Sequence, residues 1–89
     1  MNFEQQLDEV LLELRTMLLE KNRKYGNSAL NPTRIFSKAS NVEQIKVRID
    51  DKLSRMQNQQ NDEDEDITQD LIGYLIILKI ANKNNSGQI

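Results

Sequence analysis

The sequence predicts an all-α fold, a three-helix antiparallel unit in a single domain that spans residues 1–81. Apolar residues recur at steps of three and four along two segments, as they do on one face of an amphipathic helix. A third segment is apolar on nearly every side, which is typical of a buried helix. With 89 residues, the chain is too short for a second domain. It also has no cysteine with which disulfides could stabilise so small a core.

The first helix is expected over residues 3–24. Its apolar residues form one stripe, which comprises Phe3, Leu7, Val10, Leu14 and Met17. Gly26 can adopt the left-handed conformation that often ends a helix, and the basic residues before it suit the negative end of the helix dipole. Residues 25–40 are predicted to form an irregular functional loop, because Asn31-Pro32 disfavours a helix and no period is sustained there.

Two further helices are expected over residues 41–57 and 65–81. Ser40 or Asn41 can cap the second helix, and the polar run at residues 58–66 is predicted to be a solvated turn. The third helix offers more apolar surface than two neighbours can cover, so we expect it to be buried in a homo-oligomeric bundle. Residues 82–89 are predicted to be a frayed tail.

The composition excludes several classes of chemistry. Without histidine or cysteine, the chain lacks the commonest general base, the commonest zinc ligands and any thiol nucleophile. A net charge of −2 provides no general attraction to DNA or to an anionic membrane. No signal core is evident, and the longest apolar run falls short of the roughly 20 residues that span a bilayer. We therefore expect a cytoplasmic protein that binds neither duplex nucleic acid nor membranes.

The second expected helix has a cationic face. Arg48, Asp51, Lys52 and Arg55 follow one another at helical spacing, on the side opposite the apolar face. This arrangement fits an ordinary solvated face with ion pairs along the helix, each worth about 0.3–0.5 kcal/mol. It fits a phosphate-binding surface equally well.

Carboxylates and a tyrosine follow one another on the third expected helix. Asp66 and Asp70 lie one turn apart, and Tyr74 follows one turn later. Together with Asp51, the two carboxylates could hold magnesium, which favours one or two carboxylates plus substrate phosphates. Alternatively Asp66 caps the helix, and Asp70, set in an apolar sequence, pairs with one of the three cations Arg48, Lys52 and Arg55.

The loop carries groups that suit a nucleotide. Aromatic rings can stack on a base, and cations and amides can bind phosphate; these residues are Lys24, Tyr25, Asn27, Arg34, Phe36 and Lys38. The alternative interpretation is a helix cap with two aromatic anchors that hold the loop to the core. The glycine-rich loop that commonly binds phosphate is absent from the sequence.

Three motifs resemble one phage protein family. They are KNRKYGNS at residues 21–28, RIDDKLSR at residues 48–55 and EDITQDLIGY at residues 65–74. In this order they resemble the nucleotide modification associated domain 1 family of phages, whose members are similar to the MazG-like all-α nucleotide pyrophosphohydrolases. The resemblance implies a phage or prophage origin, hence the host cytoplasm, and a nucleotide-related role. The positions that match the family's motifs are Tyr25, Arg48, Asp51, Lys52, Arg55, Asp66, Asp70 and Tyr74.

One departure from this resemblance bears on function. MazG-like enzymes pair a Glu-x-x-Glu motif on one helix with Glu-x-x-Asp on another, whereas the second helix here has Asp51 among cations. Cations in place of metal ligands favour direct binding of phosphate.

We therefore expect a protein that sequesters a small phosphorylated nucleotide signal of host defence, linear or cyclic, without hydrolysing it and without a cofactor. The alternatives are a magnesium-dependent pyrophosphohydrolase and a structural adaptor. The expected ligand contacts are the six loop residues named above together with Arg48, Lys52, Arg55 and Tyr74.

Overall fold

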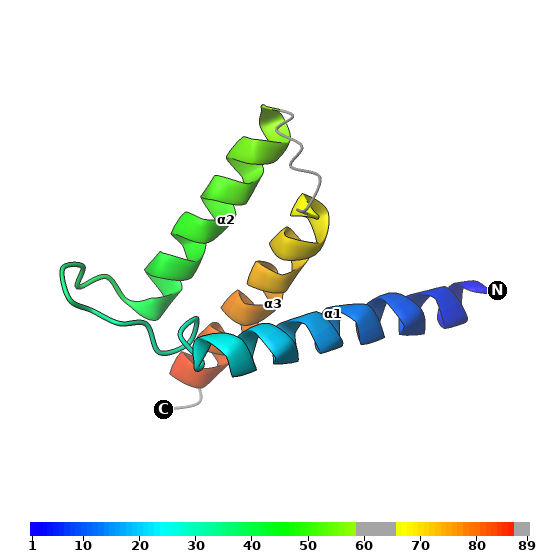
Figure 1. Cartoon of the computed structure of the whole chain (residues 1–89), viewed down its shortest axis with the longest axis horizontal. Helices are drawn as coiled ribbons and strands as arrows, with labels where there is room; N and C mark the ends of the chain where they lie inside the picture. Colours follow the sequence, from blue (N-terminus) through cyan, green and yellow to red (C-terminus); the bar gives the residue numbers. More distant parts are fainter. Residues whose placement is uncertain (59–65, 87–89) are drawn as a thin grey trace.

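The computed structural model describes residues 1–58 and 66–86, and within these ranges it contains helices but no strand (Figure 1). The helices are α1 (Phe3–Tyr25), α2 (Asn41–Gln57) and α3 (Ile67–Ser86). The all-α prediction is therefore confirmed, and the bounds of α1 and α2 match the expected ones to within one residue. Across the described residues, no helix has both the length and the apolar content needed to cross a membrane.

Helix α1 is capped at both ends. The side chain of Asn2 accepts a hydrogen bond from the backbone nitrogen of Gln5, and the Gln5 side chain accepts one from the Asn2 nitrogen, which makes a reciprocal capping box. At the other end Gly26 has φ +63°, and its N–H donates to the Asn22 carbonyl. The left-handed cap predicted at Gly26 is confirmed.

We expect substitution of Gly26 to act through the backbone alone. A Cβ added there would meet nothing within 4 Å, so the cost of Gly26→Val comes from the left-handed conformation, about 1–2 kcal/mol. For a domain of this size that loss corresponds to a fall in melting temperature of about 4–16 °C. Thermal unfolding measures this loss, with Gly26→Asn as the control. Asparagine tolerates the left-handed conformation, as Asn27 does at φ +63°, so the control should lose less stability. Equal losses in the two variants would contradict the explanation.

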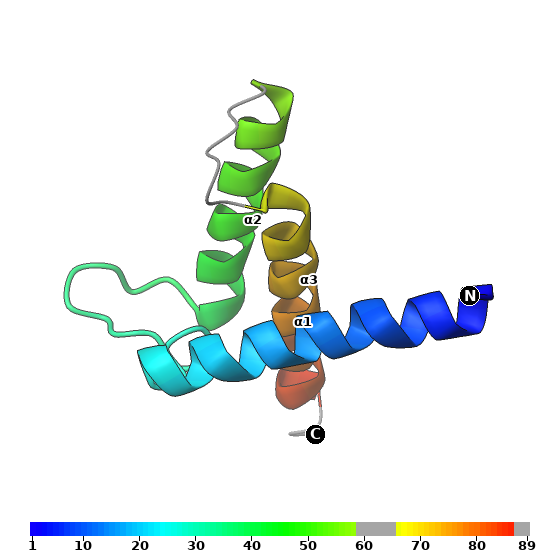
Figure 2. The ribbon, with the colours of Figure 1, turned by 45° about the vertical axis from the view of Figure 1, so that its right-hand side comes forward.

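Helices α2 and α3 lie side by side and run in opposite directions (Figures 1 and 2). Ser40 caps α2 by accepting a hydrogen bond from the Glu43 nitrogen at 3.2 Å, and Asp66 caps α3 through the Gln69 nitrogen at 2.9 Å. Helix α2 packs against α3, and Ile45 of α2 is buried. The two helices together form the larger packed unit of the chain.

Helix α1 crosses α3 instead of lining up with the pair (Figure 2). The backbones come close at Gly73, where a Cβ would lie 3.2 Å from both Leu18 Cδ2 and Met17 Cε. Leu14 is buried near this crossing, but the N-terminal half of α1 continues past α3 and leaves Phe3 77% exposed. A parallel or antiparallel alignment of all three helices is therefore not shown, and burial of α3 in an oligomer stays a prediction.

Helix α3 is longer than expected at its C-terminal end. Residues 82–86, predicted to be part of a frayed tail, continue the helix to Ser86. Ala81 is fully buried just before them, and Lys83 in the last turn suits the negative end of the helix dipole. Most of the turn predicted at residues 58–66 lies outside the described residues, as do the expected helix start at residue 65 and the tail at 87–89.

Candidate functional site

One carboxylate joins all three helices. Asp70 on α3 accepts a hydrogen bond from Lys21 Nζ of α1 at 3.1 Å through Oδ1. Its other oxygen, Oδ2, lies 3.4 Å from Lys52 Nζ of α2. We call this cluster of three residues the Asp70 bridge. It confirms the interpretation that Asp70 pairs with a cation of α2, and it identifies that cation as Lys52.

The Asp70 bridge is partly buried and contains two cations and one carboxylate. The side chains of Asp70 and Lys52 are 17% and 13% exposed, whereas Lys21 is 49% exposed. Two ammonium groups, one from α1 and one from α2, share this carboxylate. Because Lys52 and Asp70 are largely shielded from solvent, their mutual attraction is screened less than that of a surface pair. The half-exposed Lys21 is the part of the cluster that a ligand can reach.

The cationic residues of α2 do not share one environment. Lys52 pairs with Asp70 of α3 and therefore lies at the contact between α2 and α3. The prediction that it lies on a solvated face of α2 is wrong. Arg55 Nε lies 3.5 Å from the exposed Asp51 carboxylate, which is an ion pair along the helix. Arg48, one turn before Lys52, is exposed. Of these residues, Arg48 presents its charge most openly to solvent.

The carboxylates named for a metal are each engaged elsewhere. Asp51 pairs with Arg55, Asp66 caps α3 through Gln69, and Asp70 lies in its bridge. Across residues 1–58 and 66–86, no three carboxylates come close enough together to hold a metal ion. Within these ranges Asp51, Asp66 and Asp70 are therefore not gathered into one group of metal ligands.

The six residues predicted as ligand contacts in and beside the loop are all exposed. Lys24 Nζ lies 5.5 Å from the centre of the Tyr25 ring, a cation–π distance at the end of α1. Arg34 donates through Nε to the Ala39 carbonyl at 3.2 Å, so part of its hydrogen-bonding capacity holds the loop itself. Phe36 is 98% exposed and is not an anchor to the core. Asn27, in a left-handed conformation, and Lys38 are both exposed.

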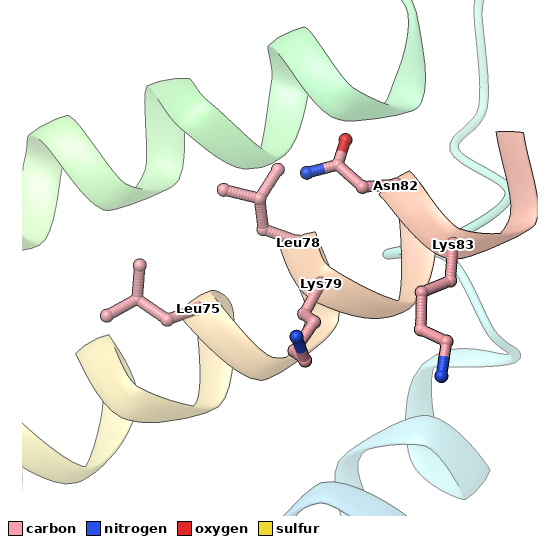
Figure 3. A pocket seen from close by; sticks show the side chains of 5 residues that line it. All are labelled: Leu75, Leu78, Lys79, Asn82 and Lys83. Carbon is pink, nitrogen blue, oxygen red and sulfur yellow. The ribbon is translucent and has the colours of Figure 1, made fainter. Parts of the chain in front are cut away.

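A shallow groove of about 350 Å³ lies elsewhere on α3 (Figure 3). Its walls are formed by Leu75, Leu78, Lys79, Asn82 and Lys83. None of these residues was singled out from the sequence as a ligand contact. Tyr74 was predicted to contact the ligand, and it is half-buried on α3 one turn after Asp70.

The chain was compared with family models, with curated proteins and with solved structures. None of them matches it. The resemblance to the phage family therefore stays an expectation, and the candidate site rests on its geometry alone.

Sequence reasoning missed Lys21 as a member of the site. It was interpreted only as one of several cations at the end of a helix, and its partner is 49 positions further along the chain. The spacing of Lys21 and Tyr25 at i and i+4 does place both on one face of α1. The spacing shows that the two residues share one face of α1. Which residues of α3 this face contacts depends on where α1 crosses α3.

Proposed function

We propose that the protein is a homo-oligomer that binds a small phosphorylated nucleotide, linear or cyclic, and holds it without hydrolysis. The observation that carries the proposal is the Asp70 bridge, in which two lysines share one carboxylate and one of them is half exposed. An incoming phosphate can bind Lys21 through a charge-assisted hydrogen bond. This interaction would give Lys21, which is 49% exposed, an anionic partner from outside the protein.

The residues on either side of the bridge suit the rest of a nucleotide. Tyr25 follows Lys21 by one turn on α1, and its ring is exposed enough to stack on a base. Arg48 precedes Lys52 by one turn on α2 and can form a two-pronged contact with phosphate. Tyr25 is the last residue of α1, where the connection over residues 26–40 begins, and Arg48 lies near the middle of α2. This region is where we place the ligand.

Binding is favoured over hydrolysis by the partners of the carboxylates. A pyrophosphohydrolase needs acidic side chains that are open to magnesium, whereas Asp51 and Asp70 each pair with a cation and Asp66 caps a helix. The family resemblance favours a nucleotide that signals host defence as the ligand. A protein that binds such a signal would lower its free concentration without consuming it.

Self-association is supported by how little apolar surface the chain covers. Among the described residues, the buried apolar side chains are Leu14, Ile45 and Ala81. Phe3, Leu7 and Leu75 are among the large apolar residues that stay exposed. A chain of 89 residues without disulfides needs more burial than this for a stable fold. Other copies of the chain can supply it.

Calorimetric titration with mono-, di- and triphosphate nucleosides and with cyclic nucleotides tests the proposed function. We expect saturable binding of at least one class of ligand and, by mass spectrometry, recovery of that ligand intact after incubation with magnesium. A lack of binding across the panel would overturn the proposal and favour the adaptor. Release of pyrophosphate that depends on magnesium would establish the enzyme instead.

Replacement of Arg48 should weaken nucleotide binding without loss of stability. Arg48→Ala removes an exposed guanidinium, and a hydrogen bond to a charged group is worth about 1.5–3 kcal/mol, or about 10- to 150-fold in Kd. The matched control is Lys46→Ala, because Lys46 lies on another side of the same helix and pairs with Glu43 at 3.6 Å. Added salt should weaken the wild-type complex as well. Equal affinity of both variants for the nucleotide would remove Arg48 from the site.

A further inference from the structure

The N-terminal half of α1 is an amphipathic arm without a partner in the described chain. The acidic arm comprises residues 3–13, and its apolar side includes Phe3, Leu7, Val10 and Leu11, all of them exposed. The first 14 residues contain four carboxylates and no lysine or arginine. None of these carboxylates forms an ion pair with another described residue. The arm therefore presents apolar surface edged by negative charge.

The groove on α3 has the complementary character. Leu75 and Leu78 provide apolar walls, and Lys79 and Lys83 lie one turn apart at its edge. Figure 3 shows the two lysine side chains pointing the same way, away from Leu78 and Asn82. Residues 71–86 contain no carboxylate, and neither lysine is ion-paired within the part of the chain that is described. The groove therefore presents apolar surface edged by positive charge.

We propose that the acidic arm of one copy docks in the α3 groove of a second copy, and that the second copy returns the same contact. Phe3 and Leu7 would cover Leu75 and Leu78. Glu4 and Asp8 would face Lys79 and Lys83. Both charged pairs have a spacing of i, i+4, which is a rise of about 6 Å along each helix, so the two carboxylates can meet the two ammonium groups together.

A second copy is the occupant that the charges favour. This chain carries both halves of the contact, so a two-fold axis satisfies the arm and the groove of each copy and leaves neither open to further growth. The arm cannot reach its own groove, because α1 is one continuous helix whose N-terminal end lies well away from α3 (Figures 1 and 2). The inference rests on the homo-oligomer of the proposed function, but it needs no nucleotide.

Charge reversal on either side of the contact tests the docking. Glu4→Lys/Asp8→Lys places four lysines at the contact, and Lys79→Glu/Lys83→Glu places four carboxylates there. Like charges that face one another oppose association, so each variant alone should have a dimer dissociation constant raised at least about tenfold. In an equimolar mixture both contacts of a heterodimer join opposite charges, so assembly should return. Sedimentation velocity measures the masses, and circular dichroism verifies the helix content of each variant.

Lys46→Glu serves as the control for charge alone, since Lys46 is exposed on α2 outside the groove. This variant should associate like the wild type. A monomeric wild type would overturn both the docking and the proposed oligomer. An oligomer that neither reversal weakens, or variants that fail to assemble when mixed, would overturn the docking alone. Nucleotide titration of the wild type is independent of these results, so failure of the ligand assignment is recognised separately.

Discussion

Asp70→Asn should lower the free energy of unfolding by about 3 kcal/mol, near the lower end of the range for removal of one partner from a buried ion pair. The substitution keeps the shape of the side chain but removes the Asp70 carboxylate from Lys52, which is 13% exposed. It also removes the charge that binds Lys21 of α1. The corresponding fall in melting temperature is about 12–24 °C for a domain of this size, and urea or thermal unfolding measures it.

Asp51→Asn is the matched control. Asp51 also pairs with a cation of α2, but it is exposed, and an exposed pair contributes at most about 1 kcal/mol. A loss of stability in Asp70→Asn no larger than that in Asp51→Asn would contradict a stabilising role of the Asp70 bridge. Comparison of the two variants thus separates the effect of burial from the effect of charge.

Gly73→Leu should separate α1 from the α2–α3 pair. A Cβ at this position already lies 3.2 Å from side-chain atoms of Leu18 and Met17, and the remaining atoms of leucine would occupy space that α1 fills. Overpacking of this kind typically costs about 1–3 kcal/mol. Because the backbone of α1 comes close to α3 but not to α2 in the described structure, the position of α1 depends on its contacts with α3, which include the packing at Gly73 and the Lys21–Asp70 pair. Hydrogen exchange should show faster exchange in α1 and little change in α2 and α3.

Gly73→Ala provides the comparison for this effect. The atoms that its Cβ meets are the ends of flexible side chains, which can shift by a few tenths of an ångström. Alanine also favours a helix over glycine by up to about 1 kcal/mol, which offsets the crowding. We expect near wild-type protection of α1 in this variant. Full protection of α1 in Gly73→Leu would show that the close approach at residue 73 is not required.

The helices were predictable because their signals are local. The stripe from Phe3 to Met17, the glycine after Tyr25 and the serine before α2 act within a few residues, and the structure confirms the elements that they predict. The end of α3 was not predictable in this way. Its last residues are polar and resemble a tail, but they continue a helix that is already established, for which each further residue costs little.

The sequence predicted the candidate site only where the chemistry of one residue requires a partner of a given kind. An acid within the apolar run of α3 needs a cation, and this requirement correctly pointed to α2 as the source of a partner for Asp70. The contribution of Lys21 depends on where α1 crosses α3, and periodicity along a single helix does not determine a crossing. The exposure of Phe36 likewise depends on the course of the loop, which no pattern in residues 25–40 specifies.

The two lysines on Asp70 affect what ligand entry costs. Removal of the only cation from a shielded carboxylate leaves a bare charge, and that penalty can cancel the gain from a new contact. Asp70 has one lysine on each oxygen, so a phosphate that draws Lys21 away leaves Lys52 in place at 3.4 Å. The Asp70 carboxylate would therefore keep Lys52 as its counterion while Lys21 binds the phosphate. If a phosphate binds as proposed, Lys21 would exchange one anion for another while the Lys52–Asp70 pair continues to hold α2 and α3 together.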